Sequence, residues 1–145
     1  MADGFVKQLT VFIENRVGTL EEVAKVLKDN DINIYSISLA DTSEYGLLRM
    51  IVSDPDKGSK VLKDSSFSAK ATEVVAVRLE NKVGSLENLF NTLSGAGIGI
   101  EYMYAMATSK VGAMILKTSD GNKAVEVLKG AGFGLLDESG MFNLA

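Results

Sequence analysis

The strongest constraint on the fold is an internal repeat. The segment ENRVGTL at residues 14–20 returns as ENKVGSL at residues 80–86, so equivalent positions lie 66 residues apart. The same shift matches further apolar and glycine positions along the chain without a gap. Solenoid repeats have periods of roughly 20 to 50 residues, so a longer period indicates that each copy is a small domain. We therefore predict two modules, residues 1–73 and residues 74–145.

The composition excludes several kinds of chemistry. The 145-residue chain has no cysteine and no histidine. Disulfides and thiol nucleophiles are therefore excluded, and the commonest general base and transition-metal ligand are missing. With 15 basic and 19 acidic residues the net charge is −4, and the lysines are scattered among acids. This pattern argues against nucleic acid as a partner. We expect no catalysis, no cofactor and no metal.

Neither a membrane segment nor a secretion signal is indicated. No apolar run approaches the length of roughly 18 residues that a membrane-spanning helix needs. The N-terminus lacks a basic region followed by an apolar stretch, which is the pattern of a signal peptide. We expect no membrane partner and a cytoplasmic location.

Each copy has the pattern strand, helix, strand, strand, helix, strand. In the first copy we expect strands at 7–13, 32–39, 45–52 and 67–71, and helices from Thr19 and from Pro55. In the second copy we expect strands at 75–79, 98–105, 112–117 and around Leu135, and helices after Gly84 and at 122–129. The segment 141–144 is expected to add an edge strand. The predicted class is α+β, two ferredoxin-like βαββαβ modules in tandem, whose antiparallel sheets carry the helices on one face.

The repeated segments are expected to open the first helix of each copy. Gly18 breaks the strand pattern, and Thr19 is placed to cap a helix with Glu22 as its reciprocal partner. This helix is expected to run to about Asn30. Each helix has an apolar stripe that we expect to be buried on the sheet: Leu20, Val23, Ala24 and Leu27 in the first copy, and Leu86, Leu89, Phe90 and Leu93 in the second.

The turn before each helix is a candidate binding site. Main-chain amides at a helix N-terminus carry positive dipole character and suit a carboxylate. Each turn also offers a glycine that permits positive φ, a hydroxyl and a side-chain amide: Gly18, Thr19 and Asn15 in the first copy, and Gly84, Ser85 and Asn81 in the second. The alternative is that these residues only form the turn and cap the helix.

The order of elements, together with ENRVGTL followed by DINI and ENKVGSL followed by GIGI, resembles a tandem pair of ACT domains. These are small-molecule-sensing modules attached to many amino-acid metabolic enzymes. The resemblance covers nearly the whole chain and appears twice. It implies an amino acid bound between paired modules, by the turn after the first strand of one module and the second strand of its neighbour. Pairing within one chain or across two is left open, and we expect a homodimer.

The resemblance also implies particular contacts. In serine-sensing members the turn reads ENRPG and its asparagine contacts the ligand, a role that falls on Asn15 and Asn81. A second contact, from the asparagine of a VNI motif, matches Asn33, whereas the second copy has Gly99 there. Val17 and Val83 replace the family's proline, and Ile13 and Leu79 stand where those members have histidine. These departures argue against serine itself.

The candidate ligand-binding residues come from the two turns and the two second strands. They are Asn15, Arg16, Val17, Gly18, Thr19, Leu20, Asn33 and Tyr35 in the first copy, and Asn81, Lys82, Val83, Gly84, Ser85, Leu86, Glu101 and Met103 in the second. Glu101 is suited to pair with an α-ammonium group or is a solvated strand acid. Strand alternation places Tyr102 opposite Glu101 unless a bulge intervenes. Met103 is suited to an adaptable pocket or to the core.

Three functions are compatible with these residues. The leading hypothesis is a non-catalytic amino-acid-binding regulatory or sensor protein. Its two sites should differ in affinity, because Gly99 replaces Asn33 and Glu101 replaces Tyr35 in the second copy. The alternative is a regulatory subunit that docks on an amino-acid biosynthetic enzyme, such as an acetolactate synthase-like partner. The third is an enzyme, whose catalytic acids would have to share one site; the candidates are Glu14, Asp41, Glu80 and Glu101.

Overall fold

The computed structural model describes residues 4–41, 44–106 and 112–137, which form six strands and four helices. They separate into two compact units. The first unit comprises residues 7–72, and the second comprises residues 73–137 together with residues 4–6. The predicted α+β class with helices and antiparallel strands in two related modules is confirmed.

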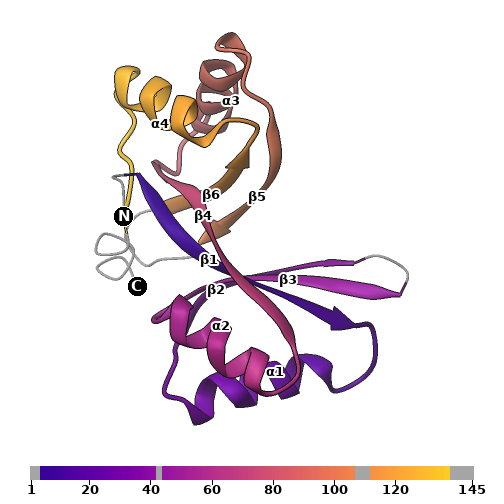
Figure 1. Cartoon of the computed structure of the whole chain (residues 1–145). Coiled ribbons are helices and arrows are strands. Elements are labelled where there is room, and N and C mark those ends of the chain that lie inside the picture. The colour runs from indigo at the N-terminus through magenta and orange to yellow at the C-terminus, as the bar shows by residue number, and fades with distance from the viewer. Residues whose placement is uncertain (1–3, 42–43, 107–111, 138–145) are drawn as a thin grey trace. The chain divides into compact units, whose positions relative to one another are not determined.

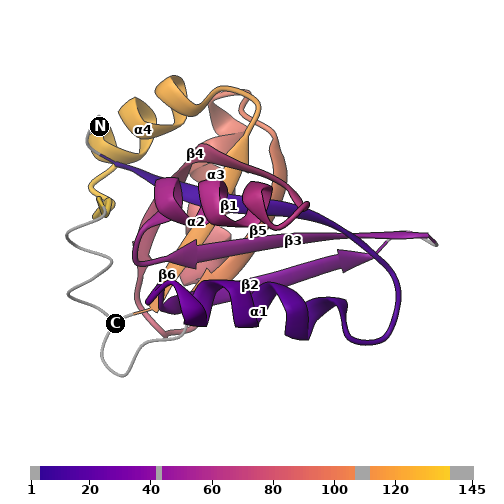
Figure 2. The same ribbon diagram turned by 60° about the horizontal axis from the view of Figure 1, so that its bottom comes forward.

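The first unit contains two helices beside a sheet in the order β2-β3-β1-β4. Its elements are β1 (Phe5–Glu14), α1 (Thr19–Asp29), β2 (Ile34–Asp41), β3 (Tyr45–Val52), α2 (Pro55–Asp64) and the start of β4 (Ser68–Leu79). β3 is antiparallel to both β1 and β2, and Figure 2 shows β2 and β3 running side by side. α1 and α2 are neighbours in this unit (Figure 1). This arrangement leaves β2 at one edge of the unit's sheet.

The second unit repeats the plan with one shortened element. Its elements are the rest of β4, α3 (Ser85–Gly95), β5 (Ile100–Met106), β6 (Gly112–Thr118) and α4 (Gly121–Gly130), with strands in the order β4-β6-β5. α3 and α4 are neighbours (Figure 1). The strand predicted around Leu135 is a single antiparallel bridge to Val77, flanked by hydrogen bonds from Arg78 N to Gly134 O and from Leu136 N to Ala76 O.

The two units use the same sequence positions for their cores. Fully buried apolar residues recur at the 66-residue shift in β1 and β4, in α1 and α3, and in α2 and α4. The pairs are Leu9 and Val75, Val11 and Val77, Val23 and Leu89, Leu27 and Leu93, and Leu62 and Leu128. The repeat therefore conserves the packing of each helix on its sheet.

The predicted capping box at Thr19 is wrong. The N-cap of α1 is Gly18, in a left-handed conformation with φ of 94°, and no side chain caps the helix. The Thr19 hydroxyl instead donates to the main-chain carbonyl of Arg16 at 3.1 Å, and Glu22 pairs with the Arg16 guanidinium. The left-handed glycine makes the turn so tight that the threonine hydroxyl reaches back into the turn rather than forward to the helix amides.

The predicted apolar stripes are only half buried. Val23, Leu27, Leu89 and Leu93 are buried as expected. Leu20, Leu86 and Phe90 keep 44%, 41% and 38% of their surface exposed, and Ala24 is also exposed. In α1 the buried face includes Thr19 instead, whereas the equivalent Ser85 of α3 is only partly buried.

Two further differences concern strand β4 and helix α2. The strands predicted at 67–71 and 75–79 are one continuous strand, because the residues between them include no glycine or proline to break it. Helix α2 forms although it contains Gly58, a residue of low helix propensity, and a Cβ at this position would lie 2.9 Å from Leu9 Cδ2. Glycine therefore lets α2 approach β1. The strand predicted at 141–144 lies outside the described residues.

No helix in the described part of the chain is long and apolar enough to cross a membrane.

Candidate functional site

Both repeated turns end in a left-handed glycine and open a helix without a side-chain cap. The φ angles are 94° at Gly18 and 89° at Gly84, and neither α1 nor α3 has a side-chain acceptor at its start. The other two helices differ, because Asp54 and Asp120 each accept a hydrogen bond from the main-chain N–H three residues on, at 3.1 Å. The first-turn amides of α1 and α3 thus lack the carboxylate that satisfies those of α2 and α4.

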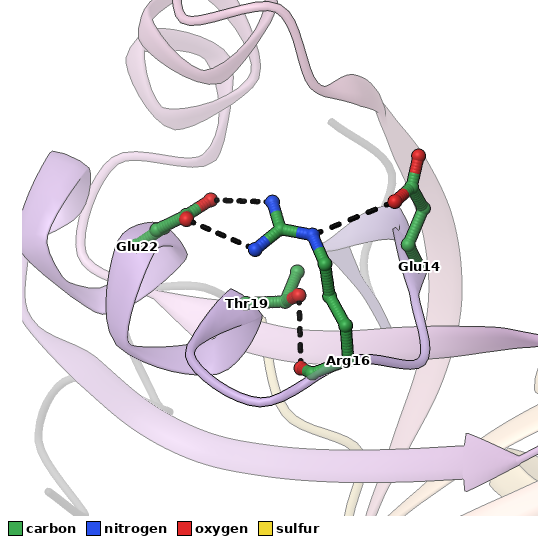
Figure 3. A network of polar contacts seen from close by, with 4 residues as sticks. All are labelled: Glu14, Arg16, Thr19 and Glu22. Atoms are coloured by element: carbon green, nitrogen blue, oxygen red, sulfur yellow. Dashed lines mark hydrogen bonds and ion pairs between the residues drawn. The ribbon is translucent and has the colours of Figure 1, made fainter.

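In the first copy an ion-pair network crosses the turn (Figure 3). The Arg16 guanidinium donates from both terminal nitrogens to the Glu22 carboxylate on α1, each at 3.2 Å. Its Nε lies 3.5 Å from Glu14 at the end of β1. The hydrogen bonds to Glu22 raise the pKa of the Arg16 guanidinium above its ordinary value, and Glu14 adds to the effect. The cation of this turn is therefore fully engaged by its own module.

In the second copy the equivalent ion pair is missing and a cavity is present. Lys82 pairs with Glu80 at 3.0 Å, but Asn88 stands where the first copy has Glu22. A cavity of about 350 Å³ opens beside this turn. It is lined by Arg78, Leu79, Glu80, Lys82, Val83, Gly84, Ser85, Asn88, Gly132, Phe133 and Gly134. Its volume lies in the range of small-molecule sites.

The second strands carry matching bulges. The pairing register shifts between Ile34 and Ser36 and again between Ile100 and Tyr102, so Tyr35 and Glu101 are the extra residues. Regular alternation, which would place Glu101 and Tyr102 on opposite faces of the strand, is therefore interrupted by a bulge at Glu101. Glu101 is exposed.

The other two candidates on the second strands have structural contacts. The main-chain N–H of Asn33 donates to Ser53 Oγ at 2.9 Å, and Gly99 makes the same bond to Ser119 at 3.0 Å. Met103 is partly buried and packs against the core of the second unit. The main-chain hydrogen bond at the start of the second strand therefore forms in both copies, with or without an asparagine side chain.

Within a unit the turn and the start of the second strand lie at opposite ends of one helix. The turn opens α1 or α3, and Asn33 or Gly99 follows the end of that helix. An 11-residue helix is about 16 Å long. The turn candidates are therefore gathered together, whereas Asn33, Tyr35 and Glu101 are remote from the turn of their own unit. The same separation keeps Glu80 and Glu101 from sharing one catalytic site.

Not every predicted turn residue lines the cavity. Lys82, Val83, Gly84 and Ser85 do, whereas Asn81 and Leu86 do not. Sequence reasoning missed Arg78, Asn88 and the glycine-flanked Phe133. Comparing the two copies position by position would have pointed to two of them, because Phe12 and Glu22 are the equivalents of Arg78 and Asn88.

Across residues 4–41, 44–106 and 112–137, no group of three or more acids is arranged to hold a metal ion.

The chain belongs to the family of ACT domain pairs, whose model matches residues 4–145. A similar solved structure is protein BT0572 from Bacteroides thetaiotaomicron, with 39% sequence identity and a TM-score of 0.91 over 98% of this chain and 99% of that one. A comparison with curated proteins finds no significant match.

More distant structures share the fold. The regulatory subunit of aspartate kinase from Thermus thermophilus has 16% identity and a TM-score of 0.59, over 87% of this chain and 92% of that one. The aspartate kinase of Clostridium acetobutylicum has 17% identity and a TM-score of 0.55, over 88% of this chain and 33% of that one. The same fold thus occurs both as a separate regulatory subunit and within a longer enzyme chain.

Proposed function

We propose that this protein is a non-catalytic regulatory protein that binds an amino acid at its Asn-x-x-Gly turns. The main support is a contrast between the helix N-termini. Asp54 and Asp120 cap α2 and α4, whereas α1 and α3 follow a left-handed glycine and lack a side-chain cap. An α-carboxylate is the acceptor that such amides suit. Membership of the ACT-domain pairs supports the regulatory role.

The proposal includes pairing with a second copy of the chain, so that the second strand of one module completes the turn site of another. An apolar groove of about 280 Å³ in the first unit supports this pairing. Leu20, Ala24 and Ile37 line it, and Ile37 lies on β2, the edge strand of that unit. An exposed apolar edge strand is a ready template for another strand.

Thermal unfolding with the twenty common amino acids tests the ligand. An amino acid present at 100 times its Kd should stabilise the protein by about 2.7 kcal/mol. Gly84→Ala should weaken this effect, because its φ of 89° disfavours any side chain. Gly95→Ala is the matched control, since its added Cβ meets no atom within 4 Å. If no amino acid raises the unfolding temperature, the proposed function is wrong.

The same groove also favours a second candidate function, docking of the chain on a biosynthetic enzyme as its regulatory subunit. Light scattering on purified wild type and on Ile37→Lys separates the two. A dimer that the substitution converts to a monomer supports self-pairing. A wild type that is monomeric with and without amino acid favours an enzyme as the occupant.

A further inference from the structure

The cavity of the second unit contains an excess of positive charge. Two cationic side chains, Arg78 and Lys82, line it against one anionic side chain, Glu80. Lys82 and Glu80 pair with each other at 3.0 Å. Arg78 forms no ion pair with any residue that the structure describes, and its main chain is fixed to Gly134 by a 2.8 Å hydrogen bond. Arg78 is exposed, and among the described residues its guanidinium is the cavity's one charge without an ion-pair partner.

The equivalent position of the first unit has the opposite character. Phe12 replaces Arg78, and the turn contributes two anions, Glu14 and Glu22, against the single cation Arg16. All three of these charges are already joined in one network (Figure 3). A ligand with a net negative charge is therefore favoured at the second turn over the first.

The polar groups around the second cavity are diverse enough to hold three charged groups of one ligand. Ser85 offers a hydroxyl, Asn88 offers an amide, and the first turn of α3 offers main-chain amides. The Glu80 carboxylate has two oxygens, so it can accept from an ammonium group while it pairs with Lys82. Arg78 presents a planar fork that matches a carboxylate in bidentate geometry.

We propose that the second unit is specific for an amino acid with an acidic side chain, whose second carboxylate is bound by Arg78. The inference rests on the proposed function, because it names the ligand class of that same site. The α-carboxylate occupies the amides at the start of α3, the α-ammonium group meets Glu80, and the side-chain carboxylate meets the guanidinium. A ligand with one net negative charge balances the single positive charge in excess.

Isothermal titration calorimetry with isosteric pairs tests the specificity. The probes are L-glutamate against L-glutamine and L-aspartate against L-asparagine, each added to wild type, to Arg78→Gln and to Lys129→Gln. Lys129 is an exposed cation in the last turn of α4 and does not line the cavity, so it controls for the loss of one charge. A hydrogen-bonded ion pair predicts that wild type and Lys129→Gln bind at least one acidic member about tenfold or more tighter than its amide. Arg78→Gln should abolish that preference without weakening the amide.

Any other result of this titration contradicts either the specificity or the proposed function. If neutral amino acids bind wild type as well as or better than both acidic ones, or if the acidic preference survives in Arg78→Gln, the specificity is wrong and the proposed function stands. If no amino acid of the full set binds at all, the proposed function itself fails and the specificity fails with it. Circular dichroism of Arg78→Gln confirms that a loss of binding does not arise from unfolding.

Discussion

The two repeated turns share a backbone but differ in what their side chains do. Both end in a left-handed glycine that opens an uncapped helix. In the first copy Arg16 and Glu22 close over the turn, whereas in the second copy Asn88 leaves Lys82 without a carboxylate on the helix. A cavity lies beside this second turn. The difference teaches that a duplicated fold can keep its architecture while a few side chains change the charges and ion pairs at each turn.

The helices that follow the two turns also differ in their stabilising side-chain contacts. Lys25 and Asp29 form an ion pair at 2.6 Å along α1, four residues apart. The equivalent residues of α3 are Asn91 and Gly95, which form no such pair, and glycine lowers helix propensity. The copy with the open cavity therefore also has the helix with less support of its own.

Truncation of equivalent core leucines should give the largest effect. Leu27→Ala and Leu93→Ala each remove a fully buried side chain from the same position of the two cores. Each should lower the free energy of unfolding by about 2 to 5 kcal/mol, and hydrogen exchange should place the loss in the variant's own unit. A loss in one variant less than half of that in the other would show that the two cores are not equivalent.

Installing the first copy's ion pair in the second should close the cavity. Lys82→Arg combined with Asn88→Glu should weaken binding of the stabilising amino acid about tenfold or more, which is about 1.4 kcal/mol. Calorimetry measures the change. Lys82→Arg combined with Asn91→Glu is the matched control, because Asn91 lies on the same helix but does not line the cavity. Equal affinities in the two double variants would contradict the idea that an ion pair across the turn hinders binding.

A buried hydroxyl offers a smaller test. The Thr118 Oγ1 atom in the second unit is buried and has no hydrogen-bond partner within the described residues, and its equivalent in the first unit is Val52. Thr118→Val should therefore raise the free energy of unfolding by about 1 kcal/mol, since an unsatisfied buried hydroxyl is costly. Chemical denaturation measures the gain. A loss of stability would mean that the Thr118 hydroxyl has a hydrogen-bond partner in the folded protein.

The smallest effect concerns the ion pair on α1. The hydrogen bond from Lys25 lowers the pKa of Asp29 below its ordinary value of 3.8, with Lys28 adding to the effect. Because the folded-state pKa is lowered, the pair adds stability above about this pH and loses it as the pH falls through the lowered pKa. Lys25→Met should raise the pKa of Asp29 in an NMR titration. Lys60→Met breaks a pair of the same spacing with Asp64 on α2 and should leave Asp29 unchanged.

The architecture followed from the sequence because the repeat and the apolar periodicity are both visible there. Alternation predicted β1 and β3, and the core positions recurred at the expected shift. Thr19 shows the limit: a threonine followed three residues later by a glutamate fits a capping box, but the left-handed Gly18 directs its hydroxyl backward. That choice depends on the backbone path of the turn, which residue types alone do not specify.

The site was less visible than the fold. The turns were predicted, but the role of Arg78 in the cavity depends on two segments far apart in sequence, since Gly132 and Gly134 lie beyond α4. The bulge at Tyr35 was not predicted and the bulge at Glu101 was left open, because both segments have the residue pattern of ordinary strands. In both cases the missing information is tertiary, and only comparison of the two copies would have supplied part of it.

The unbroken course of β4 has a practical consequence for dissecting this protein. Its first residues belong to one compact unit and its last residues to the other, and β1 is divided in the same way at residues 6 and 7. A fragment of residues 74–145 would therefore lack residues 4–6, which belong to its own compact unit, whereas residues 1–73 would carry that strand segment without the unit it belongs to. The second unit is therefore not contiguous in the sequence, and a ligand measured on residues 74–145 would report on a unit that lacks part of β1.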